Sequence, residues 1–136
     1  MADTFEFEIV TPEKLVVRDV AEEMQIPGKN GYLGILPGHA PLITELAVGE
    51  ISYRNQGYVH RLCVAWGFAE VLPNKVTVLA ETAERADEID IKRAEDAKQR
   101  AEQRLLSADP TTDFDRAEKA LQRADSRLQV ASKSGS

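Results

Sequence analysis

The stretch KVTVLAETAERADEIDIKRAEDAKQRA, residues 75–101, contains the change of pattern that divides the chain. KVTVLAE follows a turn at Pro73-Asn74 and is predicted to be the last of a series of short strands. From Ile91 onward the spacing becomes helical, and apolar residues stand at Ile91, Ala94, Ala97, Ala101 and Leu105. The stretch therefore predicts a β domain followed by a helical domain.

Composition changes at the same place. Every glycine except Gly135 lies at or before Gly67, and every aromatic residue except Phe114 lies at or before Phe68. Beyond about residue 83 the chain consists mainly of Ala, Glu, Lys, Arg and Gln. We expect an N-terminal antiparallel β-sandwich or barrel over residues 1–85, then a C-terminal antiparallel α-helical hairpin over residues 86–136.

The first half shows strand alternation between turn signals. In FEFEIV, residues 5–10, Phe and Ile alternate with Glu, which is typical of a half-buried strand. GKNG at 28–31 and NQG at 55–57 are predicted turns, because glycine and asparagine readily adopt positive φ. LITELAV and EISYR are predicted strand segments on either side of Gly49.

The second half contains a heptad stripe made of Phe114, Ala117, Leu121, Ala124, Leu128 and Ala131. SADPTTD, residues 107–113, separates two helices, and Thr112 or Asp113 is the expected N-cap of the second. Large apolar contacts are expected only from Ile91, Leu105, Phe114, Leu121 and Leu128. Because the rest of the seam is alanine, we expect the hairpin to be held to the β domain by only a few kcal/mol.

The overall properties exclude several classes of protein. The chain has 136 residues and a formal net charge of -6, which argues against a nucleic-acid partner and against a polybasic membrane anchor. MADTFEFEIV lacks the features of a secretory signal, and no apolar run is long enough to span a membrane. Cys63 is the single cysteine, so no internal disulfide is possible and a cytosolic location is expected.

No catalytic or metal-binding group is apparent. Gly28, Gly31 and Gly34 have neither the spacing of a dinucleotide fingerprint nor that of a phosphate loop. His39, His60 and Cys63 lack zinc-site spacing, and Cys63 is predicted to be a small buried hydrophobe. The apolar loop GYLGILPGHAPL, residues 31–42, remains as a docking surface stiffened by two prolines, with Ile35 and Leu36 pointing inward and residues 37–41 outward.

Three segments, PGKNGYLGILPGHAPLITELAVGEI (27–51), AWGFAEV (65–71) and KVTVLAETAE (75–84), resemble the epsilon subunit of the F-type ATP synthase. The likeness covers essentially the whole chain, in the order sandwich then hairpin. One departure is Ala65-Trp66-Gly67-Phe68, where the family more often has two glycines before the phenylalanine, so the packing of this turn is in question.

The resemblance implies a non-catalytic subunit of the rotor stalk that needs no cofactor. It implies that the sandwich binds the gamma subunit and the c ring, and that an extended hairpin reaches the alpha/beta catalytic head and inhibits ATP hydrolysis. Gly31 and Tyr32 would face the c ring, and His39, Ala40 and Pro41 would face gamma or the ring. The protein would be peripheral at the cytoplasmic face of the bacterial inner membrane, attached only through the complex.

IDIKRA, residues 89–94, resembles the signature through which some bacterial epsilon subunits bind ATP. The resemblance implies Asp90 on the adenine amino group and Arg93 on the phosphates, with Arg100 and Arg123 joining from the two helices. An alternative is that Asp90 caps the first helix and Arg93 belongs to a solvated face. The motif therefore predicts ATP as a regulatory ligand. The alternative function is a stand-alone module that senses ATP.

Overall fold

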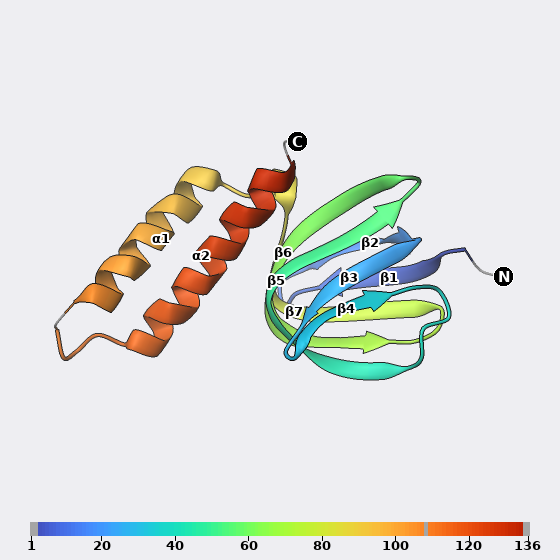
Figure 1. The fold of residues 1–136 in the computed structure, drawn as a ribbon, viewed down its shortest axis with the longest axis horizontal. Helices are drawn as coiled ribbons and strands as arrows, with labels where there is room; N and C mark the ends of the chain where they lie inside the picture. The colour runs from blue at the N-terminus through green and yellow to red at the C-terminus, as the bar shows by residue number, and fades with distance from the viewer. Residues whose placement is uncertain (1–2, 108, 135–136) are drawn as a thin grey trace.

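The computed structural model describes residues 3–107 and 109–134 (Figure 1). The strands are β1 (Phe5–Val10), β2 (Leu15–Ala21), β3 (Glu23–Gly28), β4 (Gly31–Ile35), β5 (Leu42–Asn55), β6 (Tyr58–Val71) and β7 (Lys75–Arg85). A short 3-10 helix, η1 (Ala86–Glu88), leads to α1 (Ile91–Leu106) and α2 (Phe114–Ser134). The predicted sandwich and helical hairpin are both present, in the predicted order. The division at residues 85 and 86 stays a prediction.

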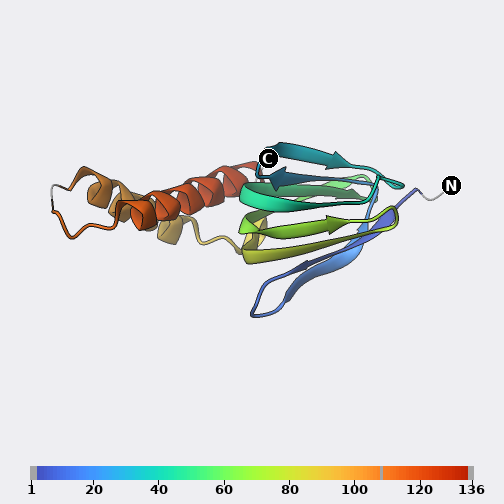
Figure 2. The ribbon, with the colours of Figure 1, turned by 90° about the horizontal axis from the view of Figure 1, so that it is seen from below.

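The seven strands form one sheet in the order β2-β1-β7-β6-β5-β3-β4, which curves so that its halves face each other (Figure 2). The expected antiparallel sandwich is confirmed, with one pair that departs from it, since β1 pairs in parallel with β7. The N-terminal strand thus continues the sheet beside the last strand, and alternation within each strand could not reveal that direction.

Strands β5 and β6 are longer than expected, because Gly49 lies inside one strand of 14 residues and Trp66-Gly67 lies inside another of 14. They are joined by the predicted turn, in which Gln56 and Gly57 both have positive φ. At Trp66 (φ 51°) and Gly67 (φ 121°) the backbone leaves the extended conformation, and β6 bends there without a change of register against β5 or β7. This kink allows one strand to contribute to both layers.

The core lies between the two layers of the sheet. It includes Phe7, Ile9, Ile26, Ile51, Leu62, Val64, Val76 and Val78. Ile35 is buried as predicted, whereas the prediction for Leu36 is wrong, since this side chain is 59% exposed. The predicted loop at 31–42 also begins with strand β4, which ends at Ile35, so Leu36 already belongs to the outward loop.

The two helices pack antiparallel, and α2 is the helix that lies against the sandwich, over β5, β6 and η1 (Figure 1). Asp113 is the N-cap of α2, because its carboxylate accepts the Arg116 backbone N–H at 3.0 Å. The seam is formed by buried Ala94, Ala101, Ala117 and Ala124. Ile91 and Phe114 were expected to make large contacts, but they lie at the helix ends and are 50% and 49% exposed, so each buries only about half of its surface.

We predict that Gly67→Ala strongly destabilises the sandwich. A Cβ at Gly67 would overlap the Leu79 carbonyl oxygen, and its φ of 121° is unfavourable for any L side chain. The expected loss is about 3 kcal/mol or more in the free energy of unfolding, measured by urea denaturation. The matched control is Gly34→Ala, since a Cβ at Gly34 would meet nothing within 4 Å. Equal stability of the two variants would contradict the packing at Gly67.

Candidate docking surfaces and the hairpin junction

The first predicted interface, Gly31-Tyr32, lies at the turn between β3 and β4. Gly31 has a φ of 128°, which allows the turn, and Lys29 ties it to β5 through an ion pair with Glu45 at 3.2 Å. The Tyr32 hydroxyl accepts the Glu50 backbone N–H at 3.1 Å. The Tyr32 side chain crosses β5 at Gly49, where a Cβ would lie 2.7 Å from the hydroxyl.

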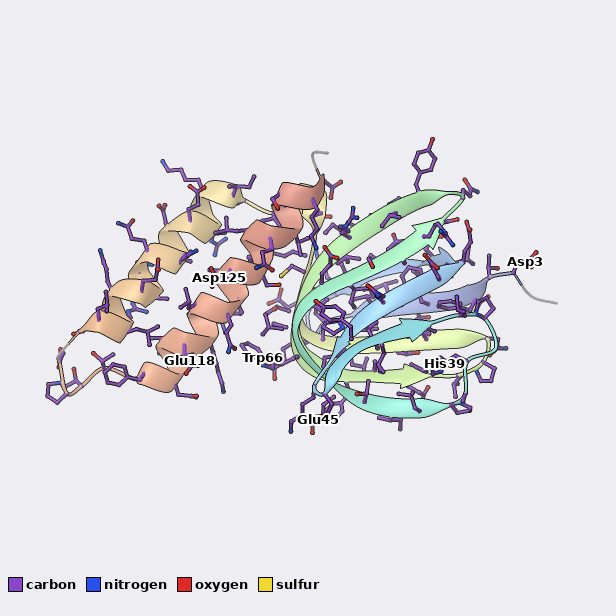
Figure 3. All side chains as sticks on the ribbon, viewed as in Figure 1. Asp3, His39, Glu45, Trp66, Glu118 and Asp125 are labelled. Atoms are coloured by element: carbon purple, nitrogen blue, oxygen red, sulfur yellow. The ribbon has the colours of Figure 1, made fainter. Side chains whose placement is uncertain are left out.

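The second predicted interface, His39 to Pro41, lies at the other end of β4, far from the helices (Figure 3). Ala40 and Pro41 are exposed and His39 is half-buried. His39 Nδ1 lies 2.7 Å from the Ala40 carbonyl oxygen, and the Gly38 N–H donates to the Pro73 carbonyl at 2.8 Å. The predicted docking residues therefore form two separate surfaces rather than one loop.

A third surface was not anticipated from the sequence. Ile43, Phe68 and Leu79 are 72%, 53% and 55% exposed, and we call them the apolar strip. Phe68 pairs with Leu79, while Ile43 lies opposite Glu70 in the register of β5 and β6. They share the outer face of the sheet, because Phe68 and Glu70 are two residues apart on one strand. The only sequence signal was the presence of apolar residues on both faces of these strands.

Carboxylates border the apolar strip. Glu45 lies opposite Phe68 and Glu70 lies opposite Ile43. Glu45 is paired with Lys29, whereas Glu70 forms no ion pair with any residue in the described part of the chain. An apolar surface with an unpaired carboxylate at its edge is complementary to a partner surface that combines apolar and basic residues.

The hairpin meets the sandwich at a small junction beneath α2. Cys63, Ala86, Ile89, Val130 and Ala131 form its apolar cluster. Cys63 is buried as predicted, and its thiol donates to the Ser126 hydroxyl at 3.3 Å. The pKa of the Cys63 thiol is raised above its ordinary value, mainly because the thiol is buried. The thiol is therefore neutral and packs as an apolar group.

Polar contacts surround this apolar cluster. Arg127 Nε donates to a Glu84 carboxylate oxygen at 2.6 Å, and Lys133 Nζ lies 3.4 Å from Glu50. Further along α2, Lys119 Nζ and the Arg123 guanidinium carbon lie 5.9 and 5.5 Å from the centre of the Trp66 ring. Lys119, Arg123 and Arg127 follow one another at intervals of four residues, so they form one cationic row on the side of α2 that contacts the sandwich.

The four residues predicted for ATP lie at three places in this structure. Asp90 and Arg93 are together at the start of α1, where the Asp90 carboxylate accepts the Arg93 backbone N–H at 3.0 Å. Arg100 lines a hollow of about 680 Å³ at the opposite end of the hairpin, and Arg123 lies over Trp66. Capping by Asp90 is confirmed, and the nucleotide role of these residues stays a prediction.

Two family models match the chain. Residues 4–86 match the ATP synthase Delta/Epsilon chain beta-sandwich domain, and residues 87–132 match the Delta/Epsilon chain long alpha-helix domain. The chain belongs to the ATP synthase delta/epsilon family. The resemblance inferred from the three segments is thereby confirmed.

Relatives within the delta/epsilon family extend the match over the whole chain. The ATP synthase epsilon chain of Geotalea daltonii is 48% identical over 136 residues, which is 99% of each chain. That of Koribacter versatilis is 74% identical over 110 residues, covering 81% of this chain and 78% of the relative. Both are named epsilon chains, which agrees with the resemblance to the epsilon subunit.

Solved structures share the family fold at low identity. A chain in the Euglena gracilis mitochondrial ATP synthase, solved with OSCP, F1 and c-ring, matches with a TM-score of 0.82 at 21% identity, covering 96% of this chain and 82% of that one. A chain in the Tetrahymena thermophila central stalk and c-ring has a TM-score of 0.52 at 15% identity. Neither helix of the described residues is sufficiently long and apolar to traverse a bilayer.

We predict that Asp90→Ala weakens the hairpin, whereas Asp90→Ser does not. Serine can accept the Arg93 N–H in place of the carboxylate, and alanine cannot. The expected loss for the alanine variant is about 1 kcal/mol, seen as earlier melting of the helical signal in circular dichroism. Identical melting of both variants and the parent chain would show that the cap contributes nothing.

Proposed function

We propose that the chain is a non-catalytic subunit of the rotating central stalk, where it couples proton flow through the c ring to ATP synthesis. Membership of the delta/epsilon family supports this assignment. The observation that carries it is the apolar strip of Ile43, Phe68 and Leu79, an exposed surface on an otherwise well-packed sandwich. The complex, rather than this chain, holds the catalytic sites.

In this proposal the gamma subunit covers the apolar strip. The occupant would need an apolar stripe beside basic residues, since Glu70 borders Ile43 and the whole chain carries a net charge of -6. Gly31 and Tyr32 would face the c ring, and His39 to Pro41 would contact gamma or the ring. These two surfaces lie at opposite ends of β4 and can meet different partners at once. Attachment at the cytoplasmic face of the membrane would follow from the c ring.

The hairpin is the proposed regulatory part. It is attached through one helix and a small apolar cluster, so it can separate from the sandwich without exposing the main core. Extended along gamma toward the alpha/beta head, it would inhibit ATP hydrolysis. Removal of residues 86–136 from the assembled complex should raise ATP hydrolysis, and unchanged hydrolysis with intact coupling would exclude this regulation.

ATP is the proposed regulatory ligand of the hairpin, through Asp90 and Arg93 with Arg100 and Arg123. The structure has Arg123 over Trp66 and Arg100 at the far end of α1, so binding would require these arginines to reorient. The Asp90→Ser variant keeps the cap and removes the carboxylate, so it should lose ATP binding while the hairpin remains stable. A stand-alone ATP sensor would bind ATP without any affinity for the stalk.

We predict that Phe68→Glu combined with Leu79→Glu prevents assembly with the stalk. Two carboxylates placed on the apolar strip oppose docking on an apolar partner and add repulsion near Glu70. Binding to membranes depleted of this subunit, measured by sedimentation, should fall at least about tenfold, which corresponds to about 1.4 kcal/mol. The double variant should unfold in urea at the concentration of the parent chain, because both positions are exposed.

The matched control for that experiment is Tyr58→Glu. Tyr58 is 74% exposed and lies at the turn between β5 and β6, away from the apolar strip. This variant should bind membranes like the parent chain. If the parent chain, the double variant and Tyr58→Glu bind membranes equally, the apolar strip is not part of the interface. If the parent chain itself does not bind, the proposed function in the stalk is wrong.

A further inference from the structure

Trp66 has a backbone conformation that is unusual for its side chain. Its φ is 51°, in the left-handed region that bulky residues rarely adopt. Gly67 follows with a φ of 121° and packs directly on the backbone of β7. This kink therefore fixes the direction in which the Trp66 side chain leaves the sheet, which is toward α2 (Figure 3).

The indole meets two cations of one helix face. Lys119 and Arg123 are four residues apart, so they lie on the same side of α2, and both are within 6 Å of the ring centre. Lys119 also pairs with Asp115 at 3.4 Å. Arg123 forms no ion pair with any residue that the structure describes, so the Trp66 ring is its contact across the junction. Both distances are within the range of a cation–π interaction.

We propose that Trp66 is a latch that holds the hairpin in its docked position through Lys119 and Arg123. The other ion pairs, hydrogen bonds and apolar contacts described above for α2 and the sandwich lie nearer the C-terminal end of the helix, from Ser126 to Lys133. The latch extends the attachment about two turns toward the N-terminal end of α2, so it opposes rotation of the hairpin about the junction. It sets the fraction of molecules in which the hairpin is undocked.

The chain carries its own reporter of undocking. Cys63 is the single cysteine, it is 6% exposed, and it is covered by α2 through Ser126 and Val130. Its reaction with a thiol reagent such as 5,5′-dithiobis(2-nitrobenzoic acid) therefore measures opening of the junction in the folded, full-length chain. A rate that rises in proportion to reagent concentration shows that opening and closing are fast relative to labelling.

We expect Arg123→Gln to raise the labelling rate of Cys63 about two- to fivefold, and Trp66→Gly to raise it further, because glycine removes both cation contacts. Glycine also adopts the φ of position 66 without strain, so the sheet is preserved. Trp66→Phe, which keeps an aromatic face, should give an intermediate rate. The control, Arg116→Gln, changes an exposed arginine of α2 that lines the far hollow, and should label like the parent.

Hydrogen exchange at the buried Val78 tests whether Cys63 is labelled through global unfolding instead. If it is not, the exchange rate of the Val78 amide should be as slow in each variant as in the parent chain. Unchanged labelling in both Arg123→Gln and Trp66→Gly would overturn the latch. If Trp66→Gly fails to fold, the labelling rate of the Arg123→Gln variant alone decides whether the latch holds the hairpin. The experiment uses the isolated chain, so its failure would leave the proposed function in the stalk unaffected.

Discussion

At Gly67 the backbone of β6 approaches β7 so closely that no side chain fits between them. This contact, together with the positive φ of Trp66, forms the kink that bends a strand of 14 residues across both layers of the sandwich. On one side of the kink, Phe68 joins Leu79 on the outer face of the sheet. At the kink itself, Trp66 reaches α2. One local constraint therefore positions both the surface proposed for the stalk and the contact proposed to retain the hairpin.

The two parts of the chain are stabilised differently. The sandwich encloses large aliphatic and aromatic side chains, including Phe7, Ile51 and Val78. The hairpin seam buries alanines, which contribute less hydrophobic free energy because each removes little apolar surface from water. Ion pairs such as Lys98 to Asp125, at 3.0 Å, join the two helices at the solvent edge, where water and salt screen the charges and such pairs contribute little to stability. The hairpin is thus the part of the chain that can move at a low cost in free energy while the sandwich stays folded.

Much of this organisation was predictable from local patterns. Alternation predicted the strand at Phe5–Val10, and helical spacing after a cap at Thr112 or Asp113 predicted α2, whose cap is Asp113. The parallel pairing of β1 with β7 was not predictable, because strand direction depends on the path of the whole chain. The kink at Trp66 was also not predictable, since nothing local to a tryptophan signals a positive φ. Leu36 was misplaced because apolar character alone does not distinguish a core position from a docking position.

We expect the hairpin to open independently of a rigid sandwich. Hydrogen exchange of the isolated full-length chain tests this independence, because it measures the opening free energy of each segment. Amides of α1 and α2 should exchange through openings of lower free energy than those of β6 and β7. A single opening free energy shared by the helices and the strands would contradict it, since the chain would then unfold as one unit.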